Sequence, residues 1–111
     1  MRVGCNMKFY NNLYMTRFCE RKKNKLCRRL KSGKGPITIF VIILAEGTDL
    51  LEIHHATFLR QSYFKHKDIL VMGFAETHAR AVKLCTRIVL DLYKDTGDFN
   101  IRSYSEGKFM E

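Results

Sequence analysis

Two stretches of the chain are apolar at nearly every position. The first, ITIFVIILA at 37–45, is rich in β-branched residues, and the second is ILVMGFA at 69–75. Apolar runs of this length, with almost no polar alternation, are typical of strands covered on both faces. The pattern therefore predicts two buried strands, with 37–45 in the interior of a sheet.

Three other segments have the patterning of helices. Apolar residues recur every three or four positions over 77–96, between Thr77 as N-cap and Gly97 as C-cap. Thr16 is a suitable N-cap for a helix over 16–30, which the SGKGP stretch at 32–36 ends. Asp49 and Glu52 have the spacing of a capping box, so a third helix is predicted over 49–64.

These elements alternate along the chain, with a weaker aromatic strand predicted at 8–15 and another at 99–105. Such alternation implies βαβ units. We expect an α/β fold with a short, mostly parallel sheet of about three strands and helices on its faces. A length of 111 residues predicts one domain. It covers 8–105 and includes the basic helix 16–30, with 1–7 as a disordered leader and 106–111 as a tail.

The net charge of +9 is concentrated at the N-terminal end. Residues 1–36 hold eleven Lys or Arg and one acid, whereas 37–111 hold nine basic and ten acidic residues. In helix 16–30 a narrow stripe of Cys19, Lys23, Leu26 and Leu30 lies opposite a wide cationic arc. The arc consists of Arg17, Arg21, Lys22, Lys25, Arg28 and Arg29. It predicts sequence-independent contacts to nucleic acid or another polyanion. The alternative is a solvated basic helix or one that faces an acidic protein.

The aromatic residues just before this helix leave two alternatives open. Phe9, Tyr10 and Tyr14 would either stack on the bases of single-stranded nucleic acid or be buried. A membrane partner is not expected, because the apolar stripe is narrow and Lys23 interrupts it. The longest apolar run is about half the length of a membrane-spanning helix.

A second candidate site comes from an internal repeat. LAEGTDLLEI at 44–53 aligns with FAETHARAVKL at 74–84, so both buried strands end in Ala-Glu before a predicted helix. Ligands of open α/β sheets bind beyond the carboxyl ends of strands. If the strands are neighbours, the site comprises Glu46, Thr48, Glu76, Thr77 and His78. The alternative is that the acids only complement helix dipoles.

The sequence assigns no catalytic residue, cofactor or metal. Its four cysteines lack CxxC spacing, its histidines lack ligand spacing, and the Gly-Lys-Gly at 33–35 lies between a helix and a strand, the reverse of a phosphate loop. Cys27 is the thiol whose basic neighbours would lower its pKa. The sequence thus favours a non-enzymatic binding or regulatory module, with a small-ligand or enzymatic domain and a purely structural homo-oligomer as alternatives.

The segment 8–104 also resembles a group of short, uncharacterised bacterial α/β proteins. The basic helix, EGTDLLEIHH, ILVMGFAE and TGDFNIRSY carry the resemblance. It implies a cytoplasmic bacterial setting, which agrees with the first residues, MRVGCNMKFY, because they contain no apolar h-region. It implies no activity, cofactor or residue role.

Overall fold

Five strands form one mixed sheet in this α/β domain. The computed structural model describes residues 6–33, 35, 37–44, 50–60, 68–97, 100–101 and 107–110. The strands are β1 (Asn6–Met15), β2 (Phe40–Leu44), β3 (Leu51–His55), β4 (Asp68–Ala75) and β5 (Phe109–Met110), in the order β3-β2-β4-β1-β5. Strands β1 and β4 are parallel, and the other described pairs are antiparallel.

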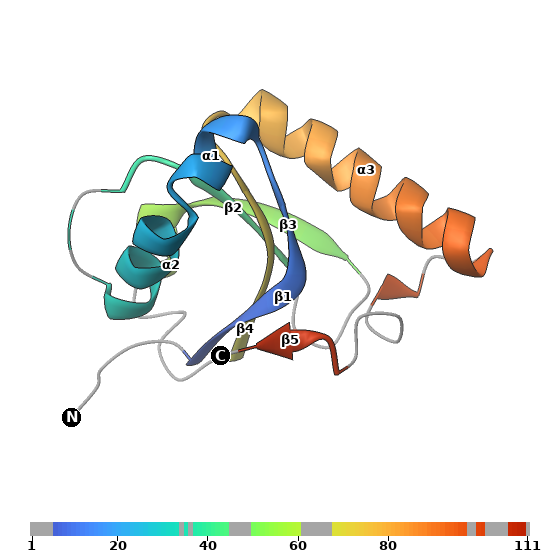
Figure 1. Cartoon of the computed structure of the whole chain (residues 1–111), viewed down its shortest axis with the longest axis horizontal. Helices are drawn as coiled ribbons and strands as arrows, with labels where there is room; N and C mark the ends of the chain where they lie inside the picture. Colours follow the sequence, from blue (N-terminus) through green and yellow to red (C-terminus); the bar gives the residue numbers. More distant parts are fainter. Residues whose placement is uncertain are drawn as a thin grey trace.

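Helices cover both faces of the sheet. One face carries α1 (Arg17–Arg21), α2 (Lys23–Ser32) and the 3₁₀ helix η1 (Ala56–Arg60), and the other carries α3 (His78–Thr96) (Figure 1). Strand β2 shows why both faces are apolar. Its residues Val41 and Ile43 pack on the α1–α2 side, while Ile42 and Leu44 pack on the α3 side. The predictions of a two-sided strand and of helices on both faces are confirmed.

The predicted helix 16–30 is present as two short helices. The Thr16 hydroxyl accepts a hydrogen bond from the Cys19 N–H at 3.4 Å, which confirms Thr16 as the N-cap. Lys22 leaves the helical conformation, and its N–H bonds to the carbonyls of Cys19 and Glu20. Helix α2 then continues to Ser32, where Gly33 ends it with a φ of 70°.

The prediction of a helix over 49–64 is wrong for the part of this segment that the structure describes. Residues 51–55 form β3, which pairs with β2 from Leu51↔Leu44 to His55↔Phe40, and η1 follows. Asp49 and 61–64 lie outside the described residues. The sequence LEIHH is compatible with either structure, and the neighbouring strand β2 offers it a complete ladder of hydrogen bonds.

The prediction of a mostly parallel sheet is also wrong, again because residues 51–55 form a strand and not a helix. The chain leaves β2 through the antiparallel β3 and then reaches β4, which runs in the same direction as β3. Strands β2 and β4 are therefore antiparallel, with Phe40 opposite Ala75 and Leu44 opposite Leu70. A crossover helix between β2 and β4 would have made the two strands parallel.

The ends of the chain differ from the predicted boundaries. Strand β1 confirms the strand expected at 8–15 but begins at Asn6, inside the predicted leader. Within the predicted tail, Phe109 and Met110 form β5 and pair with Tyr10 and Phe9. Of the strand predicted at 99–105, only residues 100 and 101 are described, and neither is in a strand.

Candidate nucleic-acid interface

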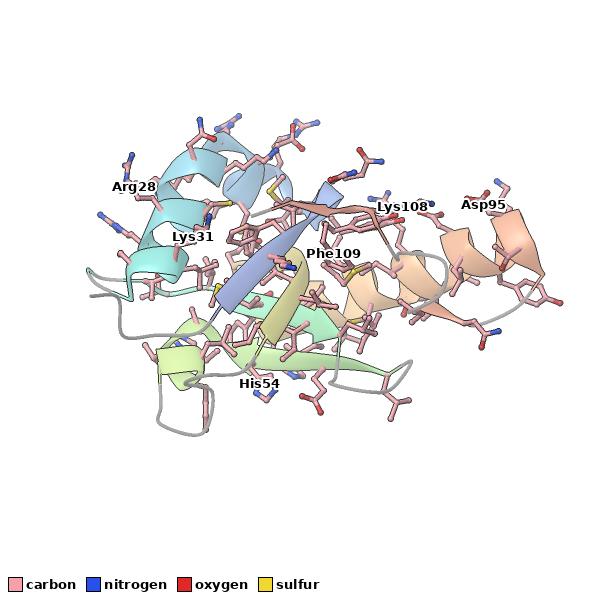
Figure 2. All side chains as sticks on the ribbon, turned by 90° about the horizontal axis from the view of Figure 1, so that it is seen from below. Arg28, Lys31, His54, Asp95, Lys108 and Phe109 are labelled. Atoms are coloured by element: carbon pink, nitrogen blue, oxygen red, sulfur yellow. The ribbon has the colours of Figure 1, made fainter. Side chains whose placement is uncertain are left out.

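Helices α1 and α2 carry the densest positive charge of the described chain. Six cations on them are exposed, and we call these the basic surface: Arg17, Arg21, Lys22, Lys23, Lys25 and Arg28. Within the part of the chain that the structure describes, none of the six forms an ion pair. Figure 2 shows Arg28 projecting away from the body of the protein. The surface is therefore available to an anionic partner.

The basic surface is positioned by a thin apolar seam. Cys19, Leu26 and Leu30 are buried against the sheet, as the narrow stripe predicts. Lys23, which the stripe also included, is exposed, because the break at Lys22 changes the direction of the chain between the two helices. Five of the six predicted arc residues are exposed, and the sixth, Arg29, is half-buried.

A small pocket opens beside this surface, between α1–α2 and the segment 37–39. Its volume is about 130 Å³, and its lining includes Phe18, Lys22, Lys25, Arg29 and Thr38. The Phe18 ring is 46% exposed, and Lys22 Nζ lies 4.5 Å from its centroid. An exposed aromatic ring among cations is the arrangement that stacks a base while holding phosphates.

Phe18 is not among the aromatic residues that the sequence offers for stacking. Phe9 and Tyr10 are buried, at 7% and 6% exposure, so the stacking alternative fails for them. Tyr14 is half-buried, and its hydroxyl donates to Asp91 Oδ2 at 2.7 Å. The signal for Phe18 was its position four residues before Lys22, which places both side chains on one side of the chain.

The second candidate site is not assembled as the repeat suggested. Strand β2 ends at Leu44, opposite Leu70 near the start of β4, whereas Glu76 follows the other end of β4. The expectation that both strands end at one edge of the sheet is wrong, because the strands are antiparallel. Glu46 and Thr48 themselves lie outside the described residues.

Glu76 instead meets Thr16, where the parallel strands β1 and β4 end. The interaction with the Thr16 side chain lowers the pKa of Glu76, desolvation opposes this, and Arg80, 3.8 Å away, lowers the pKa further. Thr77 is the N-cap of α3 and accepts the Arg80 N–H at 3.2 Å. His78 stands edge-on to Phe40, with centroids 5.7 Å apart. Thr16 and Thr77 thus serve as caps, and the Thr16 N–H joins the two strand ends by donating to the Phe74 carbonyl at 3.4 Å. Glu76 Oε1 is buried and has no hydrogen-bond partner among the described residues.

Thiol and metal chemistry find little support in the described residues. Burial raises the pKa of Cys19, Cys27 and Cys85. For Cys27 this corrects the sequence expectation, because burial outweighs the lowering by Lys23 and Lys31. No group of three or more potential metal ligands occurs among the described side chains.

Comparisons with family models, with curated proteins and with solved structures find no match to this chain. The bacterial resemblance seen in the sequence therefore stays a prediction. No helix in the described chain is long and apolar enough to cross a membrane.

Proposed function

We propose that the protein binds single-stranded nucleic acid, without sequence preference, through α1 and α2. The observation that supports this most is Phe18, an exposed ring beside a pocket bordered by Lys22, Lys25 and Arg29. A cationic surface alone suits any polyanion. Stacking favours unpaired bases, because bases inside a duplex do not expose their faces.

The binding free energy comes mainly from contacts to phosphates. Each neutralised phosphate releases counterions, so the affinity falls with salt by a log–log slope of roughly −0.7 per contact for single strands. The seam of Cys19, Leu26 and Leu30 holds the helices on the sheet, so the cations are presented on a fixed scaffold. The charged side chains bind phosphates and catalyse no reaction, so the protein acts as a binding or regulatory module.

The test measures binding of a fluorescent oligothymidylate by the full chain over a salt series. In the variant Arg21→Gln/Lys25→Gln/Arg28→Gln we expect most of the affinity to be lost. The salt slope should become shallower by about 2, because three contacts are removed. Circular dichroism checks that the variant is folded.

A matched control removes the same charge elsewhere. Lys83, Arg87 and Lys94 are exposed on α3, on the other face of the sheet. The triple variant Lys83→Gln/Arg87→Gln/Lys94→Gln should keep most of the affinity. Equal losses in the two variants would show a response to net charge alone and would contradict a site on α1 and α2. So would wild-type binding that does not respond to salt.

We propose a cytoplasmic location on the same basis. Nucleic acid is present there, and the three described cysteines, Cys19, Cys27 and Cys85, are free thiols, as is usual in a reducing compartment.

A further inference from the structure

Strand β3 forms one edge of the sheet. In the described chain β3 has β2 on one side and no strand on the other. Unpaired strand edges are sites at which another chain can pair. Figure 2 places His54 at this edge, well away from Arg28 on the basic surface.

Backbone groups of β3 alternate in direction. The Ala56 N–H donates to the Ile39 carbonyl at 2.9 Å, on the β2 side. In an antiparallel ladder the direction of these groups changes at every residue. The N–H and C=O groups of Leu51, Ile53 and His55 therefore point away from β2, toward the open edge.

An apolar groove accompanies the edge. It lies between β3 and α3, has a volume of about 660 Å³, and is lined by Leu51, Ile53, Val82 and Leu90 among others. Leu90 is 60% exposed and Val82 45%. An edge strand next to exposed apolar side chains is the combination found at interfaces that continue a sheet from one protein into another.

We infer that a second copy of this chain occupies this edge, with β3 antiparallel to its symmetry mate around a two-fold axis at Ile53. The two-fold axis must pass through a residue of β3. If it passed between two residues, each residue would lie across from one whose side chain is on the other face of the sheet. An axis at Glu52 would oppose two carboxylates, which is unfavourable. An axis at His54 would oppose two imidazoles.

The register centred on Ile53 is self-complementary. It sets Glu52 of each copy opposite His54 of the other, on the face of the sheet that also carries Val41 and Ile43. The carboxylate accepts a hydrogen bond from the imidazole, as it does within one chain, where the two atoms are 3.0 Å apart. Ile53 meets Ile53 on the α3 face, so the two apolar grooves become continuous across the axis. The inference does not depend on nucleic-acid binding.

The test is sedimentation equilibrium of the full chain without nucleic acid, at concentrations up to about 200 μM, a range in which micromolar association is measurable. In a dimer of the variant His54→Glu, the introduced carboxylate of each chain lies opposite Glu52 of the other chain. In a dimer of the variant Glu52→Lys, the introduced ammonium group of each chain lies opposite His54 of the other chain. Both changes remove the complementary pair. We expect each variant alone to raise the dimer dissociation constant by about tenfold or more.

A mixture of the two variants is the decisive measurement. In the heterodimer the lysine introduced at position 52 of one chain faces the glutamate introduced at position 54 of the other. The second pair is the original one, Glu52 opposite His54, so association should return to within about threefold of wild type. This recovery cannot come from contacts within one chain, because each chain is unchanged by mixing. As a second probe, Leu90→Glu should weaken the dimer while leaving the thermal midpoint of the monomer unchanged.

Three results would overturn the inference. The first is a wild-type chain that stays monomeric over this range. The second is a dimer that neither single variant weakens. The third is a mixture that associates no better than its components.

Discussion

The side chain of Thr16 lies beside the carboxylate of Glu76, where β1 and β4 end together, and it lowers the pKa of that carboxylate. The hydroxyl oxygen of Thr16 accepts a hydrogen bond from the Cys19 N–H and caps the N-terminus of α1. One threonine thereby connects the end of β1, the start of α1 and the residue before the cap of α3. The repeat predicts Glu46 and Glu76 in one site if the strands are neighbours, whereas the described residue beside Glu76 is Thr16.

The lowered pKa of Glu76 predicts a pH-dependent stability. The carboxylate has a lower pKa in the folded chain than its ordinary 4.5, so its contribution is fully present above that value. The contribution is lost as the pH falls through the lower pKa of the folded state. The difference in free energy of unfolding between wild type and Glu76→Gln should therefore shrink from about pH 7 to about pH 3.

The partner residue offers a separate check. Thr16→Val removes the hydroxyl, so the pKa of Glu76 should rise, which carbon NMR of the carboxyl group measures directly. Arg80, 3.8 Å away, and the Cys19 thiol also interact electrostatically with this carboxylate and are unchanged in the variant. Loss of the cap should cost about 1 kcal/mol. Thr16→Ser keeps the hydroxyl and should behave as wild type. An unmoved pKa in Thr16→Val would show that the hydroxyl is not the cause.

Phe18 should distinguish single strands from duplexes. In Phe18→Ala the affinity for oligothymidylate should fall by about tenfold, the typical loss of one stacked base. Duplex affinity should hardly change, since phosphate contacts remain. Phe18→Tyr keeps an aromatic face and serves as the control. Equal effects on both nucleic acids would mean that the ring only supports the local structure.

Gly73 allows a close approach of β4 to β1. A Cβ at this position would overlap the Tyr14 carbonyl oxygen, so one of the two strands would have to move. Gly73→Ala should therefore lose about 3 kcal/mol of unfolding free energy in urea titrations, the upper range for overpacking. Gly33→Ala is the comparison, because its Cβ would meet nothing within 4 Å and only its φ of 70° is unfavourable. Its cost should be about 1 kcal/mol. A smaller loss at Gly73 than at Gly33 would contradict the steric explanation.

The sequence by itself determined the elements whose signals are local. Helix α3 begins after Thr77 and ends before Gly97 as predicted, because capping and apolar spacing act within one segment. Strands β2 and β4 were recognisable because burial on both faces requires an unbroken apolar run. The cationic arc on α1 and α2 was equally visible, since charge belongs to individual side chains.

Only the tertiary structure decided the features that depend on pairing between distant segments. The segment LEIHH forms a strand because β2 lies beside it. The antiparallel pairing of β2 with β3 and with β4 makes the sheet mixed, and it places the ends of β2 and β4 on opposite sides of the sheet. Thr16 and Glu76 meet through the parallel pairing of β1 with β4, across some sixty residues of chain. Phe18 was visible in the sequence, but whether its ring is exposed depends on how α1 docks. These outcomes depend on packing and hydrogen bonding between segments, which local patterns do not specify.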